Sequence, residues 1–108
     1  MRETKIGEFE ELVLLIALIL QDNAYVVNIK QELYNQVGRN VAMGALHPTL
    51  TRLENKGFLT SEMTGATKER GGRRKRVYTL TTAGKTILHE VKSTRANLWN
   101  QVPHFELT

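Results

Sequence analysis

The stretch from Val41 to Leu80, VAMGALHPTLTRLENKGFLTSEMTGATKERGGRRKRVYTL, decides the fold of this 108-residue chain. Its first part predicts a helix over residues 43–56, because Leu46, Leu50 and Leu53 fall within about 40° of one another at 3.6 residues per turn. The opposite side is small, polar and free of carboxylates: Gly44, Pro48, Thr51 and Asn55, flanked by His47 and Arg52. Such a face can enter a DNA major groove without repelling phosphate.

A β-hairpin is predicted directly after this helix. Gly57 is a typical residue just past a helix end, and β-branched and aromatic residues favour strands over residues 58–63 and 77–80. The connection between the strands is too long for a tight turn. A helix followed at once by such a hairpin is typical of a winged helix-turn-helix.

The tip of the hairpin carries the positive charge of the chain. Residues 68–76 hold six cations and one carboxylate, a local charge of +5, whereas the whole chain has a net charge of +4. This concentration beside a candidate reading helix predicts contact with nucleic-acid phosphate. The alternative is a solvated loop that only keeps the protein soluble; we favour phosphate contact, because charge runs seldom follow such a helix.

Two helices are predicted before this stretch. Residues 7–20 form the first, with apolar residues nearly all the way round, which requires burial on two sides. One side can be the chain's own core, and the simplest partner for the other is a second copy. The second helix covers residues 24–37 and is apolar on one side only. Its Lys30 and Gln31 can meet a phosphate backbone, although ordinary surface is the simpler interpretation.

The start of the helix over residues 43–56 breaks two local rules. Ala42 stands where a capping Ser or Thr would stabilise the helix by about 1 kcal/mol. Pro48 lies too deep in the helix to avoid the loss of a backbone hydrogen bond. Two such departures suggest a functional compromise. Alternatively, residues 43–47 form an irregular turn and the regular helix begins near Pro48.

A last helix is predicted over residues 83–101, with Thr81 or Thr82 as its cap. Its apolar stripe follows heptad spacing and is longer than the rest of a monomer can cover. We therefore predict a homodimer in which this helix lies against the first helix of the partner. The predicted dimer contacts are Leu12, Leu15, Ile16, Ile19, Leu88, Val91, Leu98, Trp99 and Val102.

Composition excludes several function classes. The absence of cysteine rules out disulfides, thiolate catalysis and cysteine-based zinc sites. The three histidines are scattered, and no nucleotide-binding or nucleophile motif is present, so we predict no enzyme, no cofactor and no metal. The longest apolar run has nine residues, where a membrane span needs about twenty. We therefore expect a cytoplasmic protein without a membrane partner.

Five segments, in the right order, resemble the PadR family of transcriptional regulators: residues 7–15, 24–25, 44–57, 69–78 and 80–84. The resemblance implies a homodimeric winged helix-turn-helix repressor that binds double-stranded DNA at a pseudo-palindromic operator. The chain departs from the family pattern at His47, where Tyr is usual, at Ala42, where Ser is usual, and at Val26, where Gly is usual.

The short C-terminal region resembles the small subfamily with a single dimerisation helix. In that subfamily a tryptophan of the last helix can line a central pore that stacks flat aromatic compounds, which implies Trp99 as a binding residue for a small aromatic effector. The alternative, which we favour, is that Trp99 only packs in the dimer core.

The complete prediction is a mainly α fold with one small β-hairpin (α+β), in the order helix, helix, helix, strand, wing, strand, helix. Residues 1–80 form the DNA-binding winged helix-turn-helix domain, and residues 81–108 form the dimerisation helix and tail. The predicted DNA contacts are Met43, Gly44, His47, Pro48, Thr51, Arg52, Arg73, Arg74 and Lys75. The competing hypothesis is a winged-helix module whose basic loop binds an acidic protein.

Overall fold

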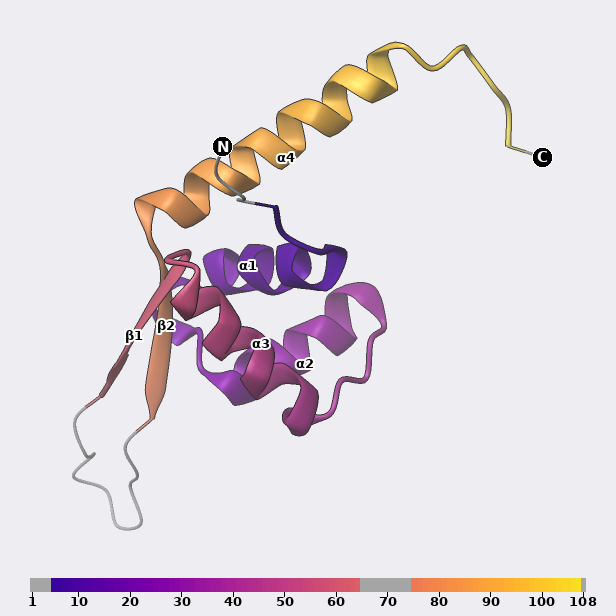
Figure 1. Cartoon of the computed structure of the whole chain (residues 1–108). Coiled ribbons are helices and arrows are strands. Elements are labelled where there is room, and N and C mark those ends of the chain that lie inside the picture. Colours follow the sequence, from indigo (N-terminus) through magenta and orange to yellow (C-terminus); the bar gives the residue numbers. More distant parts are fainter. Residues whose placement is uncertain (1–4, 65–74, 108) are drawn as a thin grey trace.

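The computed structural model describes residues 5–64 and 75–107, which form a group of helices with one short antiparallel hairpin projecting from one side (Figure 1). The elements are α1 (Glu8–Leu20), the 3₁₀ turn η1 (Gln21–Asn23), α2 (Val26–Val37), α3 (Met43–Asn55), β1 (Leu59–Met63), β2 (Arg76–Leu80) and α4 (Thr82–Asn100). The predicted class and element order are confirmed. The predicted helix and strand ends agree with the structure to within two residues.

The core lies where α1 packs against α2, α3, α4 and β2. The predicted apolar face of α3 is confirmed, because Leu46, Leu50 and Leu53 are all completely buried. On α1, Val13 and Leu14 are completely buried as well. The other buried apolar side chains are Ile16, Ala17, Ala24, Ile29, Leu33, Phe58, Leu59, Tyr78, Leu80, Ile87 and Leu88.

The start of α3 is regular helix despite its unusual sequence. Ala42 is the N-cap and gives no side-chain hydrogen bond, and its carbonyl accepts the first helical bond from Leu46 N at 3.1 Å. Pro48 lies inside the helix, so the carbonyl of Gly44, four residues earlier, has no N–H partner in the helical ladder. The alternative of an irregular turn over residues 43–47 is therefore wrong.

The start of α4 is tied to the junction between α3 and β1. The hydroxyl of Thr81 accepts from Gly84 N at 3.0 Å and donates to the Gly57 carbonyl at 2.6 Å. Gly84 packs so closely on Phe58 that an added methyl group would overlap the Phe58 carbonyl oxygen. Thr81 is thus the cap of the last helix, and the direction of α4 is fixed at its first turn.

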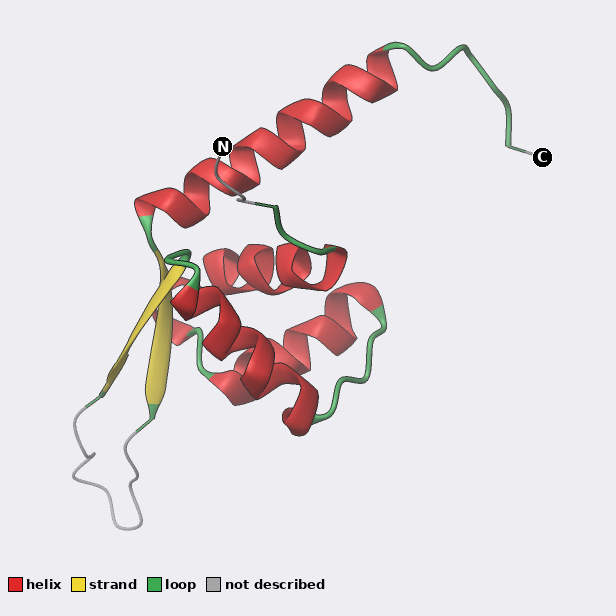
Figure 2. Cartoon of the chain, viewed as in Figure 1, coloured by secondary structure: helices red, strands yellow, loops and turns green. Residues whose placement is uncertain are grey.

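The second half of α4 leaves the body of the protein. Figure 2 shows the helix continuing past α1 and ending in an extended C-terminal segment. Gly84, Ile87 and Leu88 are buried in the core, whereas every residue of α4 after Val91 is exposed. The helix therefore consists of a buried first half and a projecting second half.

Candidate nucleic-acid interface

An open groove of about 720 Å³ lies between α3 and the base of the wing. Three parts of the chain form it: the start of α2, one side of α3, and the first residues of β2 with the residue before them. Its lining residues are Tyr25, Val26, Val27, Asn28, Met43, His47, Thr51, Glu54, Lys75, Arg76 and Tyr78.

The side of α3 that faces this groove carries Met43, His47 and Thr51 at intervals of four residues. His47 and Thr51 are exposed, and Met43 is partly exposed. Three of the predicted DNA contacts from α3 are thus brought together with a fourth, Lys75. Gly44 and Pro48 are exposed but do not line the groove.

The groove contains a carboxylate that the sequence interpretation missed. Glu54 lies one turn beyond Thr51 and is partly buried. Its Oε2 accepts a hydrogen bond from the Ser61 hydroxyl at 2.7 Å, and the same hydroxyl accepts from the Arg76 guanidinium at 3.0 Å. The prediction of a carboxylate-free reading face is therefore wrong on the side of α3 that faces the wing.

The sequence did contain a signal for Glu54. It stands seven residues after His47, and seven residues bring a helix back to nearly the same direction. The polar face was defined as the side opposite Leu46, and Glu54 lies at the margin of that side, next to His47.

The base of the wing is fixed to the start of α2. Tyr78 N donates to the Ala24 carbonyl at 3.0 Å, and Tyr25 forms an isolated β-bridge with Val77. The Lys75 ammonium lies 5.3 Å from the centre of the Tyr25 ring, a favourable cation–π arrangement. These contacts set the distance between β2 and α3 and hold Lys75 at the edge of the groove.

Arg52 is bound to α1 and does not line the groove. Its Nε donates at 3.0 Å to Glu10, and Lys56 Nζ donates to the same carboxylate at 3.0 Å. Glu10 is 6% exposed and also accepts from Gly7 N at 2.8 Å. Burial alone would raise the pKa of Glu10, but these hydrogen bonds together lower it below its usual value. Arg52 therefore has a structural partner that the sequence interpretation did not identify.

The predicted wing contacts Arg73 and Arg74 lie outside the described residues.

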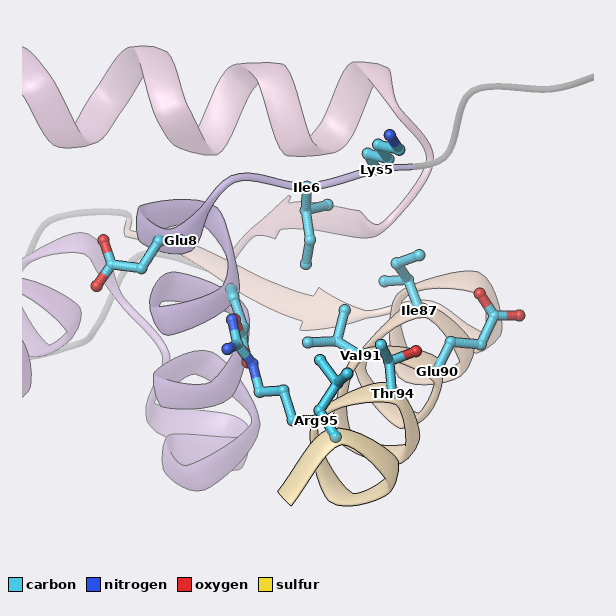
Figure 3. Close-up of a pocket in the computed structure, with 10 residues that line it drawn as sticks. Lys5, Ile6, Glu8, Ile87, Glu90, Val91, Thr94 and Arg95 are labelled. Atoms are coloured by element: carbon cyan, nitrogen blue, oxygen red, sulfur yellow. The ribbon is translucent and has the colours of Figure 1, made fainter. Parts of the chain in front are cut away.

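A second groove, of about 490 Å³, separates α4 from α1 and the segment before it. Ile6 points toward Val91 and Ile87 of α4, and the Arg95 side chain reaches toward α1 (Figure 3). The Arg95 guanidinium donates to Glu11 at 3.0 Å. The groove is thus an apolar strip with charged groups along its rim, open to solvent in the single chain.

The predicted dimer contacts fall into three groups by exposure. Ile16 and Leu88 are 3% and 8% exposed and belong to the core of their own chain. Leu12 and Val91 are partly buried. The exposed members are Leu15, Ile19, Leu98, Trp99 and Val102.

Trp99 lies on the projecting half of α4. Its ring stacks on Phe105 with a centroid distance of 6.3 Å and an interplanar angle of 22°, and 63% of the residue remains exposed. Trp99 is therefore available for contact with a partner or a ligand.

The described residues contain neither a candidate metal site nor a candidate membrane-spanning helix. Over residues 5–64 and 75–107 no group of three or more His, Asp or Glu side chains is placed to hold a metal ion. Among the described helices, none combines the length and the apolar character that crossing a membrane requires.

Comparison with known proteins gives one family match. A sequence profile described as "Transcriptional regulator PadR-like family" matches residues 15–90. No curated protein matches the chain significantly.

Several solved structures have the same fold. A PadR-like transcription factor from Bacteroides fragilis is 32% identical over 87% of this chain and 85% of its own, with a TM-score of 0.70. A PadR family transcriptional regulator from Eggerthella lenta is 26% identical over 86% of this chain and 80% of its own, with a TM-score of 0.66. The fold is also that of Bacillus subtilis PadR in complex with operator DNA, at 22% identity, 94% and 53% coverage and a TM-score of 0.63.

Proposed function

The chain belongs to the PadR-like family of transcriptional regulators, and on that premise we propose that it is a homodimeric repressor that binds double-stranded operator DNA. It contacts the DNA through α3 and the wing. The observation that carries the proposal is the groove in which His47 and Thr51 of α3 face Lys75 and Arg76 of the wing base.

The groove combines the two kinds of contact that sequence-specific DNA binding needs. His47 and Thr51 have short polar side chains that can donate to or accept from base edges in a major groove. Lys75 and Arg76 are exposed cations suited to phosphate, and such contacts fix register and orientation. Gly44 and Pro48 extend the reading face toward the start of α3, and Arg73 and Arg74 continue the wing's phosphate contacts. Arg52 pairs with Glu10 outside the groove, but its side chain is 52% exposed, and it stays a proposed DNA contact.

The proposed dimer is supported by the apolar side chains that the single chain leaves exposed. Leu15 and Ile19 of α1 and Leu98, Trp99 and Val102 of α4 are each at least 38% exposed. Pairing the projecting half of α4 with α1 of a second copy would bury both sets, and Leu12 and Val91 lie at the edge of the same surface. Ile16 and Leu88 take no part, because their own core covers them.

The chain then consists of a DNA-binding domain, residues 1–80, called here the reading unit, and a dimerisation helix with its tail, residues 81–108. The first two turns of this helix also pack in the core of the reading unit. Two reading units related by a dyad would contact half-sites about one helical turn apart. The regulator acts where the DNA lies, in the cytoplasm. An aromatic effector would bind at Trp99 in the dimer, although we favour packing as the role of this residue.

The experiment is a series of DNA-binding isotherms. The probe is a palindrome from the DNA upstream of the protein's own gene, and a scrambled duplex of equal length is the competitor. Arg73→Ala with Arg74→Ala should make the slope of log K against log salt shallower by about two units, since each lost phosphate contact removes about 0.9. Lys85→Ala with Lys92→Ala, which removes the same charge from α4, is the control and should leave the slope unchanged.

Absence of competitor-resistant binding by the unmodified protein would refute the proposal. That result would favour the module that binds an acidic protein through its basic loop.

A further inference from the structure

Glu54 is the only carboxylate among the described residues that line the groove between α3 and the wing. The other charged side chains described there, those of Lys75 and Arg76, are cations. A negative charge on a surface that meets polyanionic DNA opposes binding. Its position therefore calls for a physical reason beyond the packing of α3.

The carboxylate is fixed in position and cannot move freely out of the groove. The Ser61 hydroxyl donates to its Oε2 at 2.7 Å, and the Arg76 guanidinium donates to the Ser61 oxygen at 3.0 Å. Glu54 is partly buried, so its rotation is further restricted. Burial raises the pKa of the neighbouring Tyr78, and the Glu54 charge raises it further. The Glu54 charge thus acts inside the groove at a defined place.

A fixed carboxylate interacts differently with the two parts of DNA that could lie against it, the phosphate backbone and the base edges. Phosphate oxygens only accept hydrogen bonds and carry negative charge, so they are repelled. The exposed amino groups of bases in the major groove, above all N4 of cytosine, are donors that a glutamate can accept. The basic wing attracts any DNA, whatever its sequence. Glu54 weakens this attraction when a phosphate lies beside its carboxylate, and does not weaken it when a base edge lies there.

We propose that Glu54 is a specificity-determining residue, which weakens binding to non-operator DNA more than binding to the operator. This inference rests on the proposed function, since it concerns the same groove. Glu54 lowers the affinity for DNA in general. It lowers the affinity for incorrect DNA more than that for the operator, and so increases specificity.

Glu54→Gln is the test variant, because the amide has the same shape and its oxygen still accepts from Ser61. Glu62→Gln is the matched control. It makes the same change in net charge, and Glu62 stands next to Ser61 in β1. Glu62 is exposed, and successive side chains of a strand point to opposite faces of the hairpin. Fluorescence anisotropy would give Kd for the operator and for a scrambled duplex at one salt concentration.

Glu54→Gln should tighten binding to the scrambled duplex roughly five- to tenfold, as expected when one like charge within a few ångströms of a phosphate is removed at a protein surface. Operator affinity should change by less than about twofold, since a base edge takes the place of phosphate there. The ratio of the two affinities then falls by about the same five- to tenfold. Glu62→Gln should leave this ratio unchanged.

A second variant keeps the test decisive if the first folds poorly. Ser61→Ala keeps the charge but removes its anchor, and it should lower the affinity ratio in the same direction by a smaller factor. A ratio that stays at the wild-type value in Glu54→Gln, or in Ser61→Ala alone if only that variant folds, would overturn the inference. If the wild-type protein itself did not distinguish the operator from the scrambled duplex, the proposed function would fail instead.

Discussion

Replacing Glu10 by glutamine tests how α3 is held against α1. Glu10 is the most deeply buried of the three carboxylates that form ion pairs in the described residues, with a side chain 8% exposed. It joins Arg52 of α3 and Lys56, the residue after this helix, to the first turn of α1. Glutamine keeps the size and one acceptor oxygen but removes the charge, so the change isolates the electrostatic part of this contact.

The expected loss follows from the exposure of the partners. Removing one member of a buried ion pair costs about 3–5 kcal/mol, and one hydrogen bond to a charged group contributes about 1.5–3 kcal/mol. The side chains of Arg52 and Lys56 are 52% and 36% exposed, so water compensates them when the carboxylate is gone. We therefore expect a decrease in the free energy of unfolding of about 2 kcal/mol. For a domain of this size the decrease corresponds to a fall in Tm of about 8 °C.

The same loss should depend on pH in a defined direction. The pKa of Glu10 is lowered from the usual 4.5, because hydrogen bonds from Gly7, Lys56 and Arg52 outweigh the burial that would raise it. A lowered folded-state pKa means that the stabilisation is complete above 4.5 and disappears as the pH falls through the folded-state value. The difference between wild type and Glu10→Gln should be constant at neutral pH and shrink in acid below the usual pKa.

Urea unfolding followed by far-UV circular dichroism measures this difference, at one protein concentration because a dimer's stability depends on it. Glu8→Gln is the control: Glu8 pairs with Arg39 at 2.8 Å, but the side chains are 61% and 42% exposed. Such a surface pair should contribute less than about 1 kcal/mol. An equal loss in both variants, or a Glu10→Gln difference that persists unchanged in acid, would refute the reasoning.

Four further changes test other parts of the structure. Gly84→Ala should cost about 2 kcal/mol or more in urea unfolding, because its methyl group would overlap a backbone carbonyl. Thr81→Ala should cost about 1 kcal/mol by loss of the α4 cap, and Thr81→Ser should restore most of it. Ile19→Glu with Leu98→Glu should reduce the mass in sedimentation to that of one 12.3 kDa chain; an unchanged dimer mass would contradict the proposed interface. His47→Ala should weaken operator binding roughly tenfold and leave scrambled DNA nearly unaffected, so an equal effect on both would argue against a base contact.

The local structure of the chain could be predicted because it depends on neighbouring residues. The leucine spacing of α3, the glycine after it and the threonine before α4 each act within one or two helical turns. The resulting elements, their order and their ends agree with the structure. Regular α-helix over residues 43–47 was left open, because local rules argue against it at Ala42 and Pro48 while packing of Leu46 and Leu50 favours it.

The site was predicted less completely, since it depends on which way each helix faces. Sequence periodicity shows that α3 has two sides but not that the wing lies over the side with Glu54. The partner of Arg52 is 42 residues away on α1, and no local pattern indicates that pair. The apolar circumference of α1 likewise did not reveal that Ile16 faces the chain's own core. These assignments require the tertiary packing.

The hydrogen bond from Tyr78 to Ala24, with the bridge between Tyr25 and Val77, has a consequence for how such a protein can diversify. It anchors the middle of β2 to the two residues before α2, and the strands pair beyond this point as far as Met63 and Arg76. The spacing between α3 and β2 is therefore independent of how many residues connect the two strands. Insertions or deletions in that connection can change how far the wing extends along a nucleic acid, while the groove keeps its width. The extent of the wing and the base preference of α3 can therefore evolve separately.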